Sequence, residues 1–207
     1  MDYKLATFAD LNKIVDFHLE NFEGYYLTNL GKDVLNKYYY FFLNNKKNKF
    51  FLVKDGEEIV GLALFVEDFE EQINVFYKNN FLLLSKNILK KFVLLNKPVI
   101  SGTLSRVIST VKSDSNIYDL PRMSLLSLAI DKKNRSQGIG KSLIDFSEVY
   151  LNDLGYQSYY LSVLNTNFRG INFYKRLGFK PIKTDNNLVY FEKSIMEGPI
   201  DDRQVNA

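Results

Sequence analysis

A strand, a glycine-containing loop and an amphipathic helix follow one another between residues 125 and 154, and this unit constrains the fold more than any other part of the chain. Residues 125–130 read LLSLAI, a short apolar run typical of a buried β-strand. Residues 135–140 read RSQGIG. Apolar side chains then recur three or four positions apart and predict one face of a helix: Ile139, Leu143, Phe146, Tyr150 and Leu154. A strand, a glycine-containing loop and a helix in this order are typical of a phosphate-binding unit.

The two glycines at the start of this helix predict an anion-binding site. Gly138 and Gly140 let the backbone approach a ligand, and the first N–H groups of a helix have no partner within it. The helix dipole also favours negative charge at this end. The candidate phosphate-binding residues are Arg135, Ser136, Gln137, Gly138, Ile139, Gly140, Lys141 and Ser142. A tight turn without a ligand is the alternative interpretation.

Two known motifs compete for this loop. Residues 138–142 (GIGKS) look like the end of a nucleotide-binding P-loop, but that motif needs a glycine at the position of Arg135. Residues 135–140 instead resemble the Arg/Gln-x-x-Gly-x-Gly/Ala loop of the GNAT superfamily of acyl-CoA-dependent N-acetyltransferases. The GNAT pattern fits the loop, whereas the P-loop pattern does not.

A second motif downstream supports the resemblance. Residues 158–164 (SYYLSVL) are rich in aromatic residues and predict a strand. Residues 167–179 (NFRGINFYKRLGF) resemble the second GNAT signature, which is an asparagine, a short helix containing Phe-Tyr, and Gly-Phe at the start of a strand. Gly170 stands where the family usually has alanine, at a cost of about 1 kcal/mol in helix propensity. The two motifs occur in the family's order and cover residues 125–194.

The resemblance implies a single GNAT-like α/β domain over residues 1–195, with a mixed, twisted central sheet and helices on both faces. The N-terminal sequence agrees with this plan. Residues 3–6 predict a strand and residues 21–30 an aromatic loop between two helices. Apolar runs around Asp55-Gly56 predict a β-hairpin. Residues 196–207 are polar and aperiodic, and we expect a disordered tail.

Residues 67–121 have no counterpart in a minimal GNAT domain, where the third strand is soon followed by the fourth. We interpret them as a helical insert between the third and fourth strands. Apolar residues have helical spacing from Phe81 to Leu95, and a weaker segment runs from Thr103 to Val111. The insert is expected to pack on its own domain, and covering the acceptor site, homodimer contact and membrane-surface or partner binding are other interpretations.

The resemblance also implies a co-substrate, acetyl-CoA, and roles for particular residues. Its pantetheine arm would hydrogen-bond to the strand backbone at Leu128, Ala129 and Ile130. The Leu128 N–H would stabilise the oxyanion of a tetrahedral intermediate, and Tyr174 would protonate the leaving thiolate as general acid. Leu128 and Tyr174 are therefore the candidate catalytic residues. Tyr174 can alternatively be a packing aromatic, and Asn167 either contacts the pantetheine or caps a helix.

The acceptor side has fewer candidates. The loop after the first helix borders the acceptor groove in this fold, and it contains Phe22, Tyr25 and Tyr26. His18 lies on the apolar face of the first helix and is either a core residue or a site residue. Aromatic walls with one polar group suit an amino sugar or another small amine.

The general base is unassigned, because residues 124–130 contain no carboxylate. Asp119, Glu67 and Asp68 lie near strand ends, but charged residues at such places are expected to be solvated. A tyrosine or bulk water are the other candidates.

Composition excludes several classes of site. The chain has 27 Lys and Arg against 24 Asp and Glu, with no basic block suited to nucleic acid. It has no cysteine and one histidine, which excludes disulfides, a cysteine nucleophile and a histidine cluster for zinc. No metal site is expected. No apolar run approaches the ~18 residues of a membrane span, and with no signal-like N-terminus we expect a cytoplasmic protein.

The sequence therefore predicts an enzyme that transfers an acetyl group from acetyl-CoA to a primary amine of a small molecule. Three hypotheses compete with it. The acceptor can be a protein lysine or N-terminal amine, or the chain can be a non-catalytic acyl-CoA-binding module. The third and weakest is a nucleotide-binding protein that uses residues 138–142.

Overall fold

The computed structural model describes residues 1–93 and 120–195. The strands are β1 (Asp2–Leu5), β2 (Lys49–Asp55), β3 (Glu58–Glu67), β4 (Met123–Ile130), β5 (Ser158–Leu164), β6 (Lys180–Asp185) and β7 (Leu188–Ser194). The helices are α1 (Leu11–Asn21), α2 (Tyr26–Leu30), α3 (Lys32–Asn44), α4 (Phe69–Asn79), α5 (Phe81–Val93), α7 (Ile139–Asp153) and α8 (Phe168–Arg176). Two short 3-10 helices precede α1 and follow β4: η1 (Phe8–Asp10) and η2 (Lys132–Asn134).

The strands form one seven-stranded sheet in the order β1-β2-β3-β4-β5-β7-β6. Neighbouring strands are antiparallel except β4 and β5, which run parallel. These two pair only at Ser124 and Tyr160, near the start of β4. The rest of β4 thus diverges from β5 and leaves a gap in the middle of the sheet.

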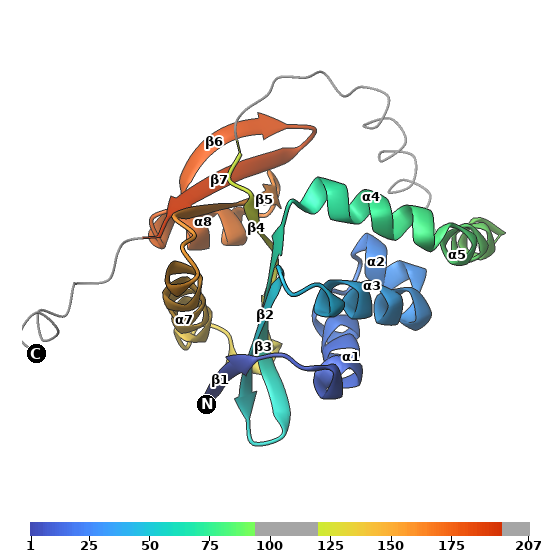
Figure 1. Cartoon of the computed structure of the whole chain (residues 1–207), viewed down its shortest axis with the longest axis horizontal. Coiled ribbons are helices and arrows are strands. Elements are labelled where there is room, and N and C mark those ends of the chain that lie inside the picture. The colour runs from blue at the N-terminus through green and yellow to red at the C-terminus, as the bar shows by residue number, and fades with distance from the viewer. Residues whose placement is uncertain (94–119, 196–207) are drawn as a thin grey trace, which may run out of the picture.

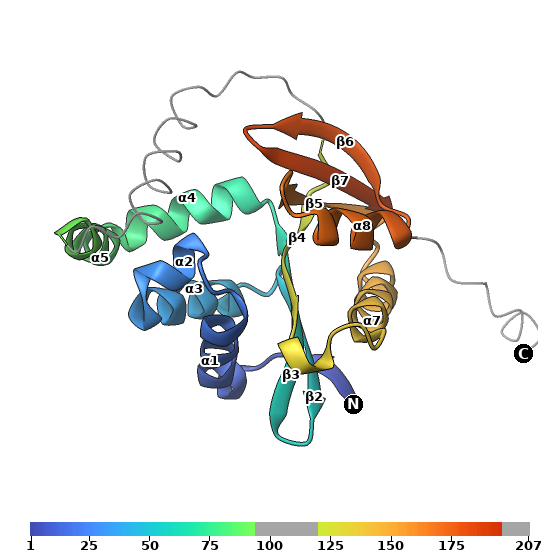
Figure 2. The same cartoon turned by 180° about the vertical axis from the view of Figure 1, so that it is seen from behind.

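The helices cover both faces of the sheet (Figure 1). Helices α1 to α5 lie on one side, and α7 and α8 lie on the other, as the reverse view also shows (Figure 2). Each layer has its own hydrophobic core, one with Tyr39 and Leu62 at its centre and the other with Phe51 and Leu143. Strand β3 is buried from Ile59 to its end because both of its faces are covered.

The predicted α/β class, mixed sheet and two-sided helical cover are confirmed. The hairpin around Asp55-Gly56 joins β2 to β3, and Gly56 has a left-handed backbone. The predicted loop over residues 21–30 is partly wrong, because Tyr26–Leu30 forms the short helix α2. Packing of α2 against α3 and α5, a long-range effect, stabilises a helix too short to form alone.

The predicted insert begins with α4 and α5. Leu84 is buried and Ile88 is partly buried against the α1–α3 core, but Phe81, the first residue of the predicted stripe, is 66% exposed. The segment from Thr103 to Val111 and the tail from residue 196 lie outside the described residues. Within residues 1–93 and 120–195, no helix combines the length and apolar character needed to cross a membrane.

Candidate active site

The gap beside β4 exposes the strand's backbone. The Asp131 N–H donates to the carbonyl oxygen of Val60 on β3 at 2.9 Å. Backbone groups of alternate residues in a strand point to the same edge, so those of Leu128 and Ile130 face the gap. Because β5 has already diverged there, this edge of β4 can pair with an extended ligand in the way that it would pair with a strand.

The loop after β4 presents backbone N–H groups at the mouth of this gap. Ser136 and Gly138 both have left-handed backbones, with φ of 66° and 82°. Helix α7 begins at Ile139, and its first i→i+4 bond runs from the Ser142 N–H to the Gly138 carbonyl at 3.1 Å. The preceding N–H groups therefore have no partner within the helix, which is the arrangement that anion-binding helix N-termini share.

Arg135 ties this loop to the strand. Its Nε donates to the Ile130 carbonyl oxygen at 2.9 Å, which holds the guanidinium beside the start of α7. Gly140 lets the helix start close to α8, because a Cβ there would lie 3.3 Å from Cζ of Phe173. Lys141 forms an ion pair with Asp145 one turn further along the helix. Positive charge and free N–H groups thus meet at one place, which suits a diphosphate.

Tyr174 projects from α8 into an aromatic cluster. Its ring lies edge-on to Phe173 and Phe179, with ring centroids 5.3 Å apart in both cases. Burial raises the pKa of Tyr174 well above its ordinary value, and the nearby Tyr25 raises it further. The phenol is therefore protonated at neutral pH and can donate a proton.

Asn167 caps helix α8. Its Oδ1 accepts a hydrogen bond from the Gly170 N–H at 2.9 Å, so the helix-cap interpretation is correct. A contact with pantetheine stays a prediction.

His18 is a core residue in this fold. Its side chain is 4% exposed and stacks on Phe22 with ring centroids 4.4 Å apart. Both ring nitrogens have partners, Tyr39 and Thr28. This geometry favours the core interpretation over direct contact with a substrate.

The two tyrosines among the acceptor candidates differ in how much of the side chain is exposed. Tyr25 is 51% exposed, and it lies edge-on to Phe22. Tyr26 is half-buried at the start of α2 and packs against the α1–α3 core. The structure therefore brings Phe22 and Tyr25 together at the aromatic loop, while Tyr26 contributes to packing.

The expectation that Glu67 is solvated is wrong. Glu67 is 6% exposed, and its carboxylate lies 2.8 Å from the Arg122 guanidinium, which also pairs with Asp68 at 2.6 Å. The same arginine reaches both carboxylates because β3 and β4 end side by side at Glu67 and Met123. Asp119 lies outside the described residues. Two of the three candidate bases are therefore held in ion pairs.

Sequence reasoning missed the polar partner of His18. The hydroxyl of Tyr39, which is fully buried on α3, lies 2.7 Å from Nδ1 of His18. Tyr39 gave no signal, because it occupies a normal core position on its helix.

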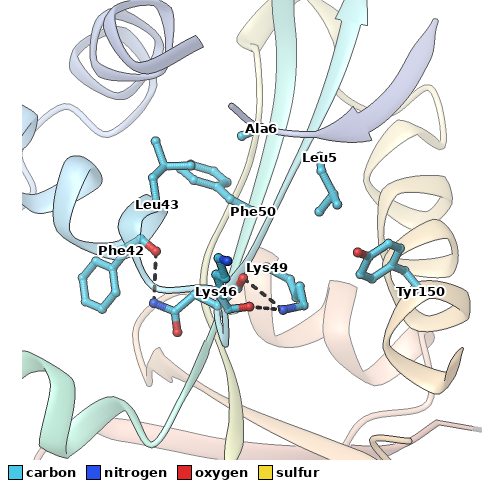
Figure 3. A pocket seen from close by; sticks show the side chains of 9 residues that line it. Leu5, Ala6, Phe42, Leu43, Lys46, Lys49, Phe50 and Tyr150 are labelled. Atoms are coloured by element: carbon cyan, nitrogen blue, oxygen red, sulfur yellow. Dashed lines mark hydrogen bonds between the residues drawn. The ribbon is translucent and has the colours of Figure 1, made fainter. Parts of the chain in front are cut away.

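A separate pocket lies at the far edge of the sheet (Figure 3). It is bounded by the ends of α3 and β1, the start of β2, and Tyr150 of α7. Its Lys49 ammonium donates to the backbone carbonyl oxygens of Lys46 and Asn48. This pocket shares no residue with the loop at Arg135.

Comparison with known proteins bears on the family and the fold of the chain. A model of the acetyltransferase (GNAT) family matches residues 11–179. No curated protein sequence matches the chain. Among solved structures, the Escherichia coli ribosomal-protein-S18-alanine N-acetyltransferase is similar, with a TM-score of 0.56 and 12% identity over 96% of this chain and 97% of that one.

Two further structures have similar folds. The PaiA N-acetyltransferase from Thermoplasma acidophilum, in complex with coenzyme A, has a TM-score of 0.58 and 15% identity over 94% of this chain and 99% of that one. An acetyltransferase of the GNAT family from Staphylococcus aureus Mu50 has a TM-score of 0.58 and 14% identity, over 94% and 99% of the two chains. At sequence identities of 12–15%, these structural similarities show a shared fold alone.

Proposed function

The chain belongs to the acetyltransferase (GNAT) family, and from this premise we propose that it acetylates a primary amine of a small molecule. It is an N-acetyltransferase, and acetyl-CoA is its co-substrate. The identity of the acceptor, the roles of individual residues and the extent of the domain, residues 1–195, are the proposed parts.

The residues around the gap fit acetyl-CoA. The loop from Arg135 to Ser142 would hold the diphosphate, because it combines a guanidinium with helix N–H groups. The gap-facing backbone of Leu128 and Ile130 would hold the pantetheine. Asn167 lies at the start of α8, and its Nδ2 would donate to that arm while its Oδ1 caps the helix.

Two groups of the chain would act on the reaction, the Leu128 N–H and the Tyr174 phenol. Acetyl-CoA supplies an acetyl thioester, whose C–S bond breaks as the C–N bond to the amine forms. The Leu128 N–H would stabilise the negative charge that develops on the carbonyl oxygen. Tyr174 would give its phenolic proton to the departing sulfur, and the proton that the amine loses would restore the phenol through solvent.

One observation carries the small-molecule proposal, the edge-on contact between Tyr25 and Phe22 in the loop after α1. Tyr25 and Phe22 form an aromatic wall on the acceptor side, and the α4–α5 pair supports it because α5 packs on α2. A wall of this kind narrows the access to the reacting atoms and suits a small amine.

A protein amine is the second candidate, and a different observation favours it. Tyr160 and Tyr190 share one face of the β5–β7 ladder. Burial raises the pKa of both, and the negative charge of Glu70, exposed in the first turn of α4, raises both further. Aromatic rings with a carboxylate on this side of the molecule can attract a cationic N-terminus or lysine.

Calorimetric titration with acetyl-CoA, with ATP and magnesium as the control, tests the co-substrate site. Micromolar binding of acetyl-CoA alone supports the proposed site, whereas binding of ATP alone contradicts it. Coenzyme A release is then measured with putrescine, glucosamine and trialanine. Turnover of the first two supports a small-molecule acceptor, and turnover of trialanine alone supports the protein amine.

A further inference from the structure

The side chain of Ile130 occupies a space that two glycines leave open. Gly61 on β3 lies opposite Ile130, and a Cβ atom on Gly61 would lie 2.6 Å from Cδ1 of Ile130. A Cβ atom on Gly140, in the first turn of α7, would lie 3.5 Å from Cγ1 of the same side chain. Because non-bonded carbon atoms pack best at about 3.5–4.0 Å, only a glycine at position 61 lets Ile130 keep this position.

The requirement for glycine at position 61 is one of space. Gly61 lies inside β3 and its φ is not positive, so alanine can adopt the same backbone conformation. The other neighbours of a Cβ atom at Gly61, the Ala129 carbonyl oxygen and Cγ2 of Val53, would be 3.4 and 3.5 Å away, which is normal contact. A glycine inside a strand weakens that strand and often marks a close approach. Here the group that approaches is the Ile130 side chain.

The carbonyl group of Ile130 is bound to the loop before α7. Arg135 Nε donates to this carbonyl oxygen at 2.9 Å. Ile130 is the last residue of β4, and its backbone groups face the gap where β4 has diverged from β5. One residue therefore contacts β3 and α7 through its side chain, and Arg135 through its carbonyl group.

Acetyl-CoA is one molecule, in which the pantetheine arm and the diphosphate are joined covalently. Two parts of a site bind such a ligand together only if the spacing between them matches the ligand. We propose that Ile130 is a positioning residue, which sets the spacing between the gap-facing edge of β4 and the loop from Arg135 to Ser142. This inference rests on the proposed placement of acetyl-CoA along that edge and that loop.

A methyl group added at Gly61 would act on Arg135 through Ile130. The Ile130 side chain would have to move away from β3, and α7 at Gly140 lies against it. The end of β4 would therefore shift together with the Ile130 carbonyl group. The guanidinium of Arg135, which is bound to that carbonyl group, would then lose its alignment with the diphosphate.

Gly61→Ala should weaken acetyl-CoA binding about tenfold, which corresponds to the loss of about one hydrogen bond. Calorimetric titration measures this Kd. Ile130→Val removes Cδ1, the atom that the new methyl group would meet, and keeps Cγ1, the atom that lies against Gly140. Ile130→Val alone should therefore bind acetyl-CoA like the wild type, and Gly61→Ala should change the Kd little in an Ile130→Val background.

A second background tests the route through Arg135. Arg135→Ala removes the guanidinium and should weaken acetyl-CoA binding by itself. Gly61→Ala should then weaken binding by no more than about twofold further, because no guanidinium is left to lose its alignment. A general loss of stability would instead weaken binding by the same factor in both backgrounds, and that result would overturn the proposal.

Val53→Ala is the matched control, because it truncates a fully buried neighbour of Gly61 on the opposite side from Ile130's strand. It should lose stability and keep its Kd. If Gly61→Ala does not fold, Ile130→Ala replaces it and should also weaken binding about tenfold. A wild-type Kd in whichever of these two variants is tested would refute the inference, as would a loss in Gly61→Ala that Ile130→Val does not restore. A wild-type protein that does not bind acetyl-CoA would instead count against the proposed placement of the co-substrate.

Discussion

A Cβ atom on Gly170 would lie 2.8 Å from Nδ2 of Asn167, the residue whose Oδ1 accepts the Gly170 N–H. The glycine that departs from the family pattern therefore makes room for the capping side chain. The low helix propensity of glycine destabilises α8, whereas the Asn167 cap that Gly170 permits stabilises the same helix.

Gly170→Ala should leave the free energy of unfolding within about 1 kcal/mol of the wild type, because the gain in helix propensity offsets a disturbed cap. In an Asn167→Ala background the same change should stabilise by about 1 kcal/mol, since no cap remains to disturb. Urea unfolding of the four proteins measures the difference. Equal effects of Gly170→Ala in both backgrounds would contradict the predicted coupling.

Tyr174→Phe should lower kcat at least ~100-fold, because a positioned proton donor is lost while the ring stays. The Kd of acetyl-CoA, measured by calorimetry, should change little. Tyr150→Phe on α7 removes a hydroxyl at the distant pocket and serves as control. Full activity of Tyr174→Phe would assign the ring to packing.

Gly138→Ala should weaken acetyl-CoA binding, because φ of 82° strains any other residue and shifts the N–H groups at the start of α7. Stability should also fall by about 1–2 kcal/mol. Gly56→Ala provides the matched control, as Gly56 has φ of 57° in the β2–β3 turn. It should lose similar stability and keep its affinity for acetyl-CoA. Equal losses of affinity in both variants would indicate a general effect of unfolding.

Stability should depend on pH between about 4 and 6.5 because of His18, whose pKa falls from 6.5 to about 4 on folding. As pH drops through this window, His18 becomes protonated in the unfolded chain but stays neutral in the folded chain. The free energy of unfolding should therefore fall by about 3 kcal/mol, at up to ~1.4 kcal/mol per pH unit.

Urea unfolding at a series of pH values measures this slope. His18→Gln should remove most of the slope above about pH 5, because the chain contains no other histidine and carboxyl groups titrate mainly below that pH. A wild-type free energy of unfolding that stays constant from pH 6.5 to 4 would show that His18 titrates normally in the fold.

Features that depend on a few neighbouring residues were predictable from the sequence. Gly138 marks the start of α7, Asn167 caps α8, and Asp55-Gly56 forms the turn between β2 and β3. Each follows from short-range chemistry, namely φ above zero at glycine or a side chain that reaches a helix N–H. The order of strands and helices followed largely from apolar periodicity, whereas the α/β class followed from the resemblance to the GNAT family.

Other features were decided by contacts between segments far apart in the chain. Glu67 is buried because Arg122 from the next strand pairs with it. Tyr39 looked like an ordinary core residue, and only the packing of α3 against α1 gives its hydroxyl a partner, Nδ1 of His18. Strand pairing and helix packing set these positions, because register and burial depend on the whole sheet and its helical layers. The sequence by itself therefore determined the family and the loop at Arg135, whereas the tertiary structure alone decided which polar side chains meet in the core.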